Sequence, residues 1–118
     1  MAMQNWNAYR DALLAKVADY GKLSPDVMRG LQTMDGGAAK TGRLDTKTHE
    51  LIALAVAVTT RCDGCIAVHT KKAVEQGATR EEIAEAVGVA ISLNAGAALV
   101  LVQREMENRR FVVSYSKH

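Results

Sequence analysis

The sequence predicts a single all-α domain of about five helices, because apolar residues recur at helical spacing in successive segments. The 118 residues, 1–118, fit one domain of ordinary size. Hydrophobic residues make up 48% of the chain, which is enough to bury a core. Glycines and helix-capping residues separate the apolar segments.

The first two helices are expected in the N-terminal third of the chain. Residues 5–22 carry apolar side chains at helical spacing, and Gly21 lies near the end of this segment. Ser24 and Pro25 then form the N-cap and first-turn proline of a second helix. We expect the second helix to end around Gly36 and Gly37.

A third helix is expected to begin at Leu44 and Asp45, with Asp45 or Thr46 as its cap. It continues through LIALAVAVTT, where apolar residues on all sides indicate a buried helix. Because several of these residues are β-branched, a strand is the alternative. A fourth helix carries both cysteines and ends at Gly77.

Thr79 and Glu82 form a capping-box pattern that begins a fifth helix, expected from about Arg80 to Glu107. The final segment, FVVSYSKH, is expected to be a frayed tail or short extended arm. Residues 86–103 are uncharged, close to the ~20 apolar residues of a membrane span. Interrupting polar residues, small residues and charged flanks favour a buried soluble helix, and its apolar character predicts a homo-oligomer.

Composition and charge restrict the setting. The chain has only two cysteines, whereas a secreted disulfide scaffold would be rich in them, so we expect redox-active or metal-binding thiols in a reducing compartment. The N-terminal residues lack the apolar segment of a secretion signal, which predicts a cytoplasmic protein. A formal net charge of +2, with basic and acidic residues interspersed, argues against nucleic-acid binding.

Cys62, Cys65 and His69 form the most informative motif, Cys-x-x-Cys-x-x-x-His. On a helix with about 3.6 residues per turn, the three side chains fall within an arc of about 60°. Cys65 and His69 have the spacing at which helical side chains meet, so the imidazole can remove the thiol proton. A dithiol beside a base suits thiol–disulfide exchange, or peroxide reduction through a sulfenic acid.

Glu50 lies 12 positions before Cys62, in the predicted third helix. By itself it is explained as a first-turn acid that the helix dipole favours. With the motif that follows, it completes the pattern Glu-x11-Cys-x2-Cys-x3-His.

This pattern resembles the alkylhydroperoxidase D-like branch of the carboxymuconolactone decarboxylase family. The likeness covers about residues 44–99 and includes the segment Gly77-Ala78-x-x-Glu81-Glu82-Ile83. The resemblance implies an alkylhydroperoxidase D-like helical bundle with the CxxC pair near the N-terminus of the fourth helix, assembled into trimers or hexamers. It also implies that the two cysteines reduce peroxides or disulfides.

The resemblance assigns a role to each matching residue. Cys65 matches the reactive thiol and Cys62 the resolving thiol, while Glu50 and His69 match a proton relay that acts through a bound water. No cofactor or metal is implied. Gly64 departs from the pattern, because members with well-defined peroxidase activity tend to have histidine immediately before the second cysteine. Glycine at this position weakens the expectation of efficient hydroperoxide reduction more than it weakens the expectation of disulfide chemistry.

The two cysteines could also bind a metal or be purely structural. Zinc would need a fourth ligand beside Cys62, Cys65 and His69; His49 or Glu50 offers one, but there is no second CxxC and no His-x3-His pair. In a structural role, both cysteines would be small core residues. A thioredoxin-like fold would need strands around the motif and usually a cis-proline after it, whereas the single proline precedes it.

Two alternative functions are compatible with the sequence. A decarboxylase or lactone-processing enzyme, the other activity of the wider family, does not depend on a redox cysteine pair. A non-catalytic oligomer would use its thiols only to register oxidation. The family likeness suggests a lipoyl-bearing protein or a peroxiredoxin as the redox partner of an enzyme, beside its hydroperoxide or disulfide substrate. We expect no membrane partner.

Overall fold

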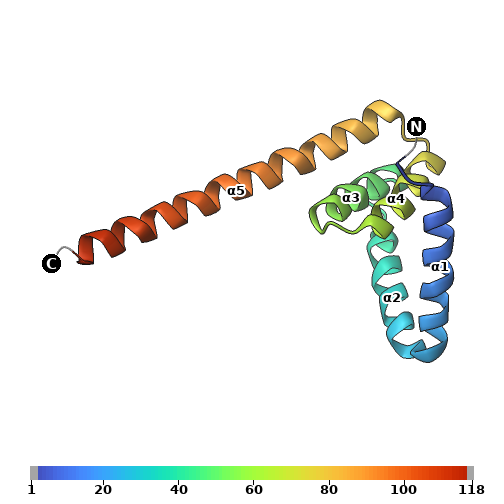
Figure 1. Cartoon of the computed structure of the whole chain (residues 1–118). Coiled ribbons are helices and arrows are strands. Elements are labelled where there is room, and N and C mark those ends of the chain that lie inside the picture. Colours follow the sequence, from blue (N-terminus) through green and yellow to red (C-terminus); the bar gives the residue numbers. More distant parts are fainter. Residues whose placement is uncertain (1–2, 117–118) are drawn as a thin grey trace.

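The computed structural model describes the backbone of residues 3–116 and the side chains of residues 3–109. Its helices are α1 (Trp6–Leu23), α2 (Pro25–Thr41), α3 (Thr46–Thr59), α4 (Asp63–Glu75) and α5 (Arg80–Ser116). Residues 3–116 contain no strand, so the predicted all-α class is confirmed. Figure 1 shows α1 and α2 as an antiparallel hairpin beside α3 and α4, with α5 projecting away from the other helices.

A small core lies where α3, α4 and the first part of α5 meet. α3 packs against both α4 and α5, while α1 packs against α2 and α4. Leu54 is the largest fully buried side chain among the described residues. The other buried apolar residues are all alanines, which lets the helices approach closely: Ala57, Ala67, Ala73, Ala78 and Ala90.

α1 and α2 form as predicted except at the end of α2. Pro25 is the first residue of α2, as expected. The predicted end at Gly36 and Gly37 is wrong, because α2 continues to Thr41. A glycine inside a helix costs only about 1 kcal/mol, so it need not end one. The helix ends instead at Gly42, which adopts the left-handed conformation with φ of 70°.

α3 is a capped helix and not the alternative strand. The Asp45 side chain accepts a hydrogen bond from Thr48 N at 2.7 Å, which satisfies a free N–H of the first turn. Hydrogen bonds from Thr48 also hold the pKa of Asp45 below its ordinary value. The predicted burial on all sides is wrong for a single chain, because Ile52 and Val56 are 48% and 54% exposed.

The turn between α4 and α5 follows the prediction. Gly77 has φ of 90°, which lets the chain leave α4 without steric strain. The capping box is present: Glu82 N donates to Thr79 Oγ1 at 3.1 Å, and Thr79 N donates to Glu82 Oε1 at 3.0 Å. Lys47 Nζ binds Glu82 Oε2 at 2.8 Å, so the start of α5 is attached to α3.

α5 is longer than the sequence predicted. The expected end near Glu107 is wrong, because the helix continues to Ser116. The expected extended arm is therefore also wrong for residues 111–116, while Lys117 and His118 lie outside the described residues. Neither glycine nor proline occurs after Gly96, so no residue in this segment breaks the helix.

α5 packs on the rest of the chain only through its first half. Ala90 is the one buried residue between 80 and 109, and residues 91–109 are all exposed. Asn94 Nδ2 donates to Thr59 Oγ1 at 3.1 Å and so attaches the middle of α5 to α3. By length and composition alone, Arg80–Arg109 would be sufficient to cross a membrane. The predicted burial of this helix is wrong within one chain, and its burial between chains remains a prediction.

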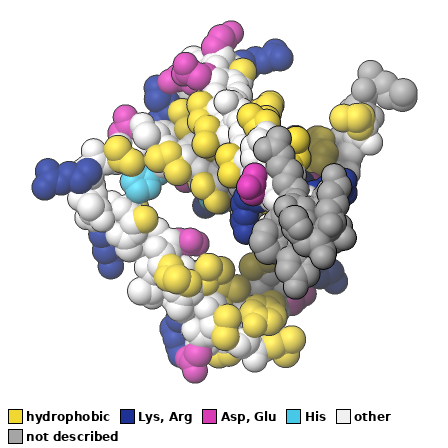
Figure 2. All heavy atoms as spheres, turned by 90° about the vertical axis from the view of Figure 1, so that its left-hand side faces the viewer, with side chains coloured by type: hydrophobic (Ala, Val, Ile, Leu, Met, Phe, Trp, Pro, Cys, Tyr) yellow, Lys and Arg dark blue, Asp and Glu magenta, His cyan; other side chains and the backbone are white. Residues whose placement is uncertain are grey.

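A single chain exposes more surface than a compact protein of its size. Its accessible surface is 9530 Å², whereas a compact 12.7 kDa protein exposes about 6,200 Å². Its radius of gyration is 19.8 Å, against about 13.5 Å for a compact chain of this length. Figure 2 shows hydrophobic patches on the face toward which α5 projects. The excess surface, about 3,300 Å², is enough for an obligate oligomer interface.

α1 packs over Gly64, the position at which members of the family that the sequence resembles tend to have histidine. Gly64 is buried, and a Cβ atom placed on it would collide with Leu13 Cδ2. A methyl group at this position requires only a rotation of the Leu13 side chain. An imidazole requires that Leu13, and α1 with it, move away from α4.

We therefore predict that Gly64→His lowers the free energy of unfolding by about 1–3 kcal/mol through overpacking. The same substitution in a Leu13→Ala background should cost at least about 1 kcal/mol less, because the truncated side chain leaves room. Urea unfolding of the four proteins at one protein concentration measures this coupling. Equal costs in the two backgrounds would show that Leu13 does not occupy the space beside Gly64.

A second prediction concerns acid stability. The hydrogen bond from Lys47 holds the pKa of Glu82 below its ordinary value of 4.5. A lowered carboxyl pKa stabilises the fold above pH 4.5, and this stabilisation is lost as the pH falls through the folded-state pKa. Glu82→Gln should therefore flatten the fall in melting temperature on acidification. Glu85→Gln, an equal charge change on α5, is the control; identical profiles for the two variants would contradict the role of the ion pair.

Candidate functional site

The two cysteines lie at the start of α4 and form a disulfide. Cys62 is the N-cap residue with extended backbone, and Cys65 is in the first turn. Their Cα atoms are 5.2 Å apart. Cys65 N donates a hydrogen bond to Cys62 Sγ at 3.1 Å. The prediction that all three motif residues lie on one helix is therefore wrong for Cys62, whose sulfur takes the place of a capping oxygen.

A very short connection fixes Cys62 in this position. α3 ends with hydrogen bonds from Arg61 N to Val58 O and from Cys62 N to Ala57 O, both at 3.1 Å. This pattern requires a left-handed residue, and Arg61 supplies it with φ of 57°. Arginine adopts this conformation less readily than glycine, so the turn is held by the helices on either side.

Glu50 and His69 meet across the interface between α3 and α4. Glu50 Oε2 lies 2.7 Å from His69 Nδ1, and their side chains are 21% and 29% exposed. A carboxylate at Nδ1 fixes the proton on that nitrogen in the neutral ring, which leaves Nε2 with a free lone pair. The family resemblance implies a relay of Glu50 and His69 that acts through a bound water, and the structure places these two side chains in direct contact.

His69 follows Cys65 by one helical turn on α4, so their side chains are on the same side of that helix. The only side-chain hydrogen bond of His69 to a described residue is the one to Glu50. Cys65 is exposed, whereas Cys62 is half-buried. Cys65 is therefore the more accessible residue of the pair to a molecule arriving from solvent.

The start of α4 is suited to carry negative charge on sulfur. Unpaired N–H groups give a helix N-terminus a partial positive charge, which stabilises an anion there. Cys62 Sγ already accepts a hydrogen bond from one of these N–H groups, that of Cys65. In an opened pair, the same hydrogen bond would stabilise a thiolate on Cys62. The site therefore distinguishes the two sulfurs by exposure and by hydrogen bonding.

Two features of the site had no signal in the sequence. Cysteine is an unusual N-cap, so the capping role of Cys62 was not expected. The packing of Leu13 on Gly64 joins residues far apart in the chain, and helical spacing alone does not reveal such a contact. Among the described residues, no group of three or more histidine, cysteine or acidic side chains is arranged to hold a metal ion.

Known proteins resemble this chain in sequence and in fold. The sequence profile of the carboxymuconolactone decarboxylase family matches residues 25–105. An uncharacterized protein from Haemophilus influenzae is 43% identical over 103 residues, covering 87% of this chain and 91% of that protein. The uncharacterized protein 4 in the cox locus of Paracoccus denitrificans is 53% identical over 57 residues, 48% of this chain and 51% of that protein.

Solved structures show the same fold. The apo crystal structure of a carboxymuconolactone decarboxylase family protein from Legionella pneumophila aligns with a TM-score of 0.71 and 36% identity, covering 81% of this chain and 86% of that one. A protein from Methanobacterium thermoautotrophicum aligns with a TM-score of 0.62 and 33% identity, covering 67% of this chain and 91% of that one. With most of its length matched in sequence and fold, the chain belongs to the carboxymuconolactone decarboxylase family.

Proposed function

We propose that the protein is a thiol-dependent peroxidase and disulfide reductase, in which Cys65 and Cys62 reduce hydroperoxides and His69 and Glu50 form the proton relay. The observation that carries this proposal is the 2.7 Å hydrogen bond between Glu50 and His69. It lies one helical turn from a cysteine pair that closes as a disulfide. A base held by a carboxylate beside a dithiol is the arrangement that thiol-based reduction requires.

In the half-reaction that reduces the hydroperoxide, His69 Nε2 takes the proton of the Cys65 thiol, and Glu50 stabilises the imidazolium. The Cys65 thiolate attacks one oxygen of the hydroperoxide. The O–O bond breaks, the alcohol leaves with a proton from the imidazolium, and Cys65 becomes a sulfenic acid. Cys62 then attacks this sulfur, so that water leaves and the Cys62–Cys65 disulfide forms.

The second half of the reaction returns the disulfide to the dithiol. A reductant thiolate attacks the exposed sulfur of Cys65, and Cys62 leaves as a thiolate. The hydrogen bond from Cys65 N supports this direction, because it stabilises the leaving sulfur. A second thiol of the reductant then releases Cys65. We propose a lipoyl-bearing protein or a peroxiredoxin as the redox partner, and a cytoplasmic location.

Two alternatives use the same fold. The family is named for a decarboxylase, and such an enzyme would not need the disulfide found here. A redox sensor would need the disulfide but no turnover. A coupled assay with hydrogen peroxide, tert-butyl hydroperoxide and cumene hydroperoxide, run beside a disulfide-reduction assay, separates them. We expect each chain to consume many equivalents of hydroperoxide when a dithiol reductant is supplied. Consumption of a single equivalent per chain would favour the sensor.

A third prediction assigns different roles to the two thiols. After one equivalent of hydrogen peroxide, Cys62→Ser should retain a sulfenic acid on Cys65, because attack needs only this thiol and its base. In Cys65→Ser, dimedone should label Cys62 only slowly. Both variants should lose catalytic turnover of hydroperoxide. Dimedone labelling with mass spectrometry measures the trapped species. Rapid labelling of Cys62 in Cys65→Ser would reverse the assignment and make the helix N-terminus the main activator.

A fourth prediction tests Glu50. In a reduced Cys62→Ser background, Glu50→Gln should slow alkylation of Cys65 by iodoacetamide at neutral pH by at least about tenfold, because the base loses its stabilising carboxylate. Removing a nearby negative charge would by itself favour the thiolate and speed the reaction. Asp63→Asn is therefore the control and should not slow it. Unchanged alkylation in folded Glu50→Gln, measured beside circular dichroism, would make Glu50 a structural residue.

We also propose that the chain works as a homo-oligomer, a trimer or a hexamer. The exposed apolar residues of α5 and the excess surface of a single chain support this assembly.

The fifth prediction follows from this proposal. Sedimentation velocity at micromolar concentration should show a species several times the 12.7 kDa of one chain. Leu99→Glu and Val102→Glu together should dissociate it, since both residues are exposed on the outer part of α5. Lys16→Glu with Lys22→Glu, on α1, is the control for added acidic charge. A compact monomer of the unaltered protein would contradict the proposal.

A further inference from the structure

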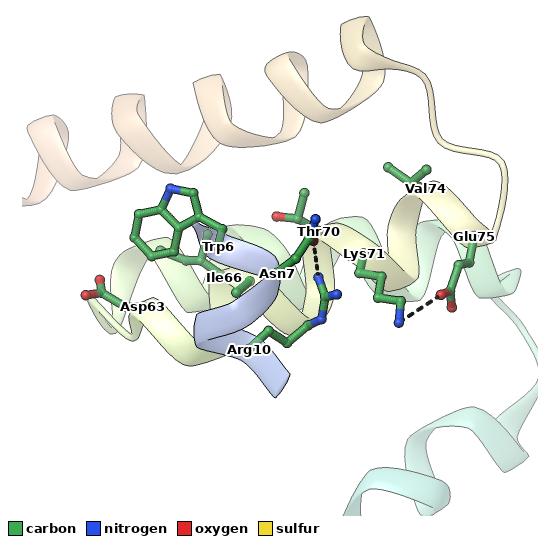
Figure 3. A pocket seen from close by; sticks show the side chains of 10 residues that line it. Trp6, Asn7, Arg10, Asp63, Ile66, Thr70, Lys71, Val74 and Glu75 are labelled. Carbon is green, nitrogen blue, oxygen red and sulfur yellow. Dashed lines mark hydrogen bonds and ion pairs between the residues drawn. The ribbon is translucent and has the colours of Figure 1, made fainter. Parts of the chain in front are cut away.

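A groove between α1 and α4 has no part in the proposed redox chemistry. Its volume is about 590 Å³, which is within the range of small-molecule sites. Figure 3 shows side chains from α1 and α4 around it. On α4, Ile66 and Thr70 each follow a motif residue by one position, which turns them about 100° around the helix axis from Cys65 and His69. The groove is therefore on another side of α4.

The walls of the groove are mainly apolar. Trp6 from α1 and Ile66, Ala67 and Val74 from α4 contribute side chains to it. The Trp6 ring packs edge-on against Tyr9 with centroids 5.8 Å apart, which holds the indole in place. Trp6 remains 44% exposed, so its apolar ring is available to a ligand. These walls favour a ligand with an apolar body.

Arg10 places a positive charge inside this apolar groove. Its side chain is only 11% exposed, yet its nearest carboxylate, Asp11 Oδ1, is 3.8 Å from Nε and 73% exposed. Such a long and solvated ion pair contributes little. Arg10 also donates to the neutral Asn7 Oδ1 at 3.1 Å, while its buried Nε has no hydrogen-bond acceptor among the described residues. A cation removed from water without full pairing is unfavourable, so the guanidinium lacks an anionic partner.

The acidic residues of the groove do not supply that partner. Figure 3 shows Asp63 at one end and the Lys71–Glu75 pair at the other, with Arg10 beside Asn7 and Thr70 between them. Lys71 Nζ and Glu75 Oε1 are 3.7 Å apart and offset each other. The middle of the groove therefore combines an apolar wall with one unsatisfied positive charge.

We propose that this groove binds an apolar monocarboxylate, such as a medium-chain fatty acid. The carboxylate binds the Arg10 guanidinium, with the Thr70 hydroxyl as a second donor, and the apolar body lies against Trp6 and Ile66. A carboxylate offers two acceptor oxygens in the plane of the guanidinium, and such pairs are stronger than neutral hydrogen bonds. The binding involves no bond breaking and does not depend on the proposed peroxidase function.

The chain carries its own reporter, because Trp6 is its single tryptophan. The test titrates the intact oxidised protein with decanoate, decanol and decylamine below their micellar concentrations, following Trp6 fluorescence and the indole N–H signal by NMR. We expect saturable binding of decanoate, at least about tenfold tighter than decanol, because a charged hydrogen bond is added to the same chain. Decylamine should bind more weakly than decanol.

Variants localise the site. Arg10→Gln should remove the preference for decanoate over decanol, whereas Arg29→Gln, an equal charge change at an exposed residue of α2, should keep it. Because Arg10 is largely buried, Arg10→Gln is judged only if its circular dichroism is unchanged. Val74→Phe narrows the groove from a position that is 57% exposed. It should weaken the binding of both decanoate and decanol.

Three results would overturn the proposal. Equal binding of decanoate and decanol would show that Arg10 does not recognise the carboxylate. An unchanged preference in folded Arg10→Gln, or unchanged affinities in Val74→Phe, would place binding elsewhere. Absence of any binding, with Trp6 shielded from acrylamide quenching in the oligomer, would show that a second copy of the chain covers the groove.

Discussion

The candidate site depends on the hydrogen bond between Glu50 and His69. It joins α3 to α4 at 2.7 Å, beside the small core that these helices share. Both side chains are half-buried, so water competes less for the carboxylate than it would at the surface. The bond selects one tautomer of the imidazole and limits its rotation. The neutral imidazole thereby presents one defined nitrogen, Nε2, that can accept a proton.

The cysteine pair depends on the backbone in the same way. The connection between α3 and α4 is so short that Cys62 follows the left-handed Arg61 directly and caps α4. Cys62 is therefore half-buried and hydrogen-bonded by Cys65 N, while Cys65 is exposed. An attacking thiol and a leaving thiol need different surroundings, and the start of one helix provides both. In the proposed reaction, His69 supplies the base for the exposed thiol.

Local signals predicted the helix starts well, whereas long-range contacts escaped them. Asp45 and the Thr79–Glu82 pair cap their helices as expected, because a cap depends on neighbouring residues. Gly36 and Gly37 did not end α2, since a glycine penalty is small beside the hydrogen bonds that continue the helix. The apolar composition of α5 predicted a buried helix, whereas residues 91–109 are exposed in a single chain. The direct contact of Glu50 with His69 depends on how α3 packs against α4. The sequence pattern contains both Glu50 and His69, but only the fold shows that their side chains touch.

The most direct test of this account is the tautomer of His69 in the oxidised protein. Nitrogen-15 NMR of histidine-labelled protein, with the signal identified by its loss in His69→Gln, distinguishes the protonated from the unprotonated ring nitrogen. In the neutral ring we expect a proton on Nδ1, held by Glu50, and a free lone pair on Nε2. A ring protonated on Nε2, or one that exchanges between both forms, would show that Glu50 does not hold the imidazole as the relay requires.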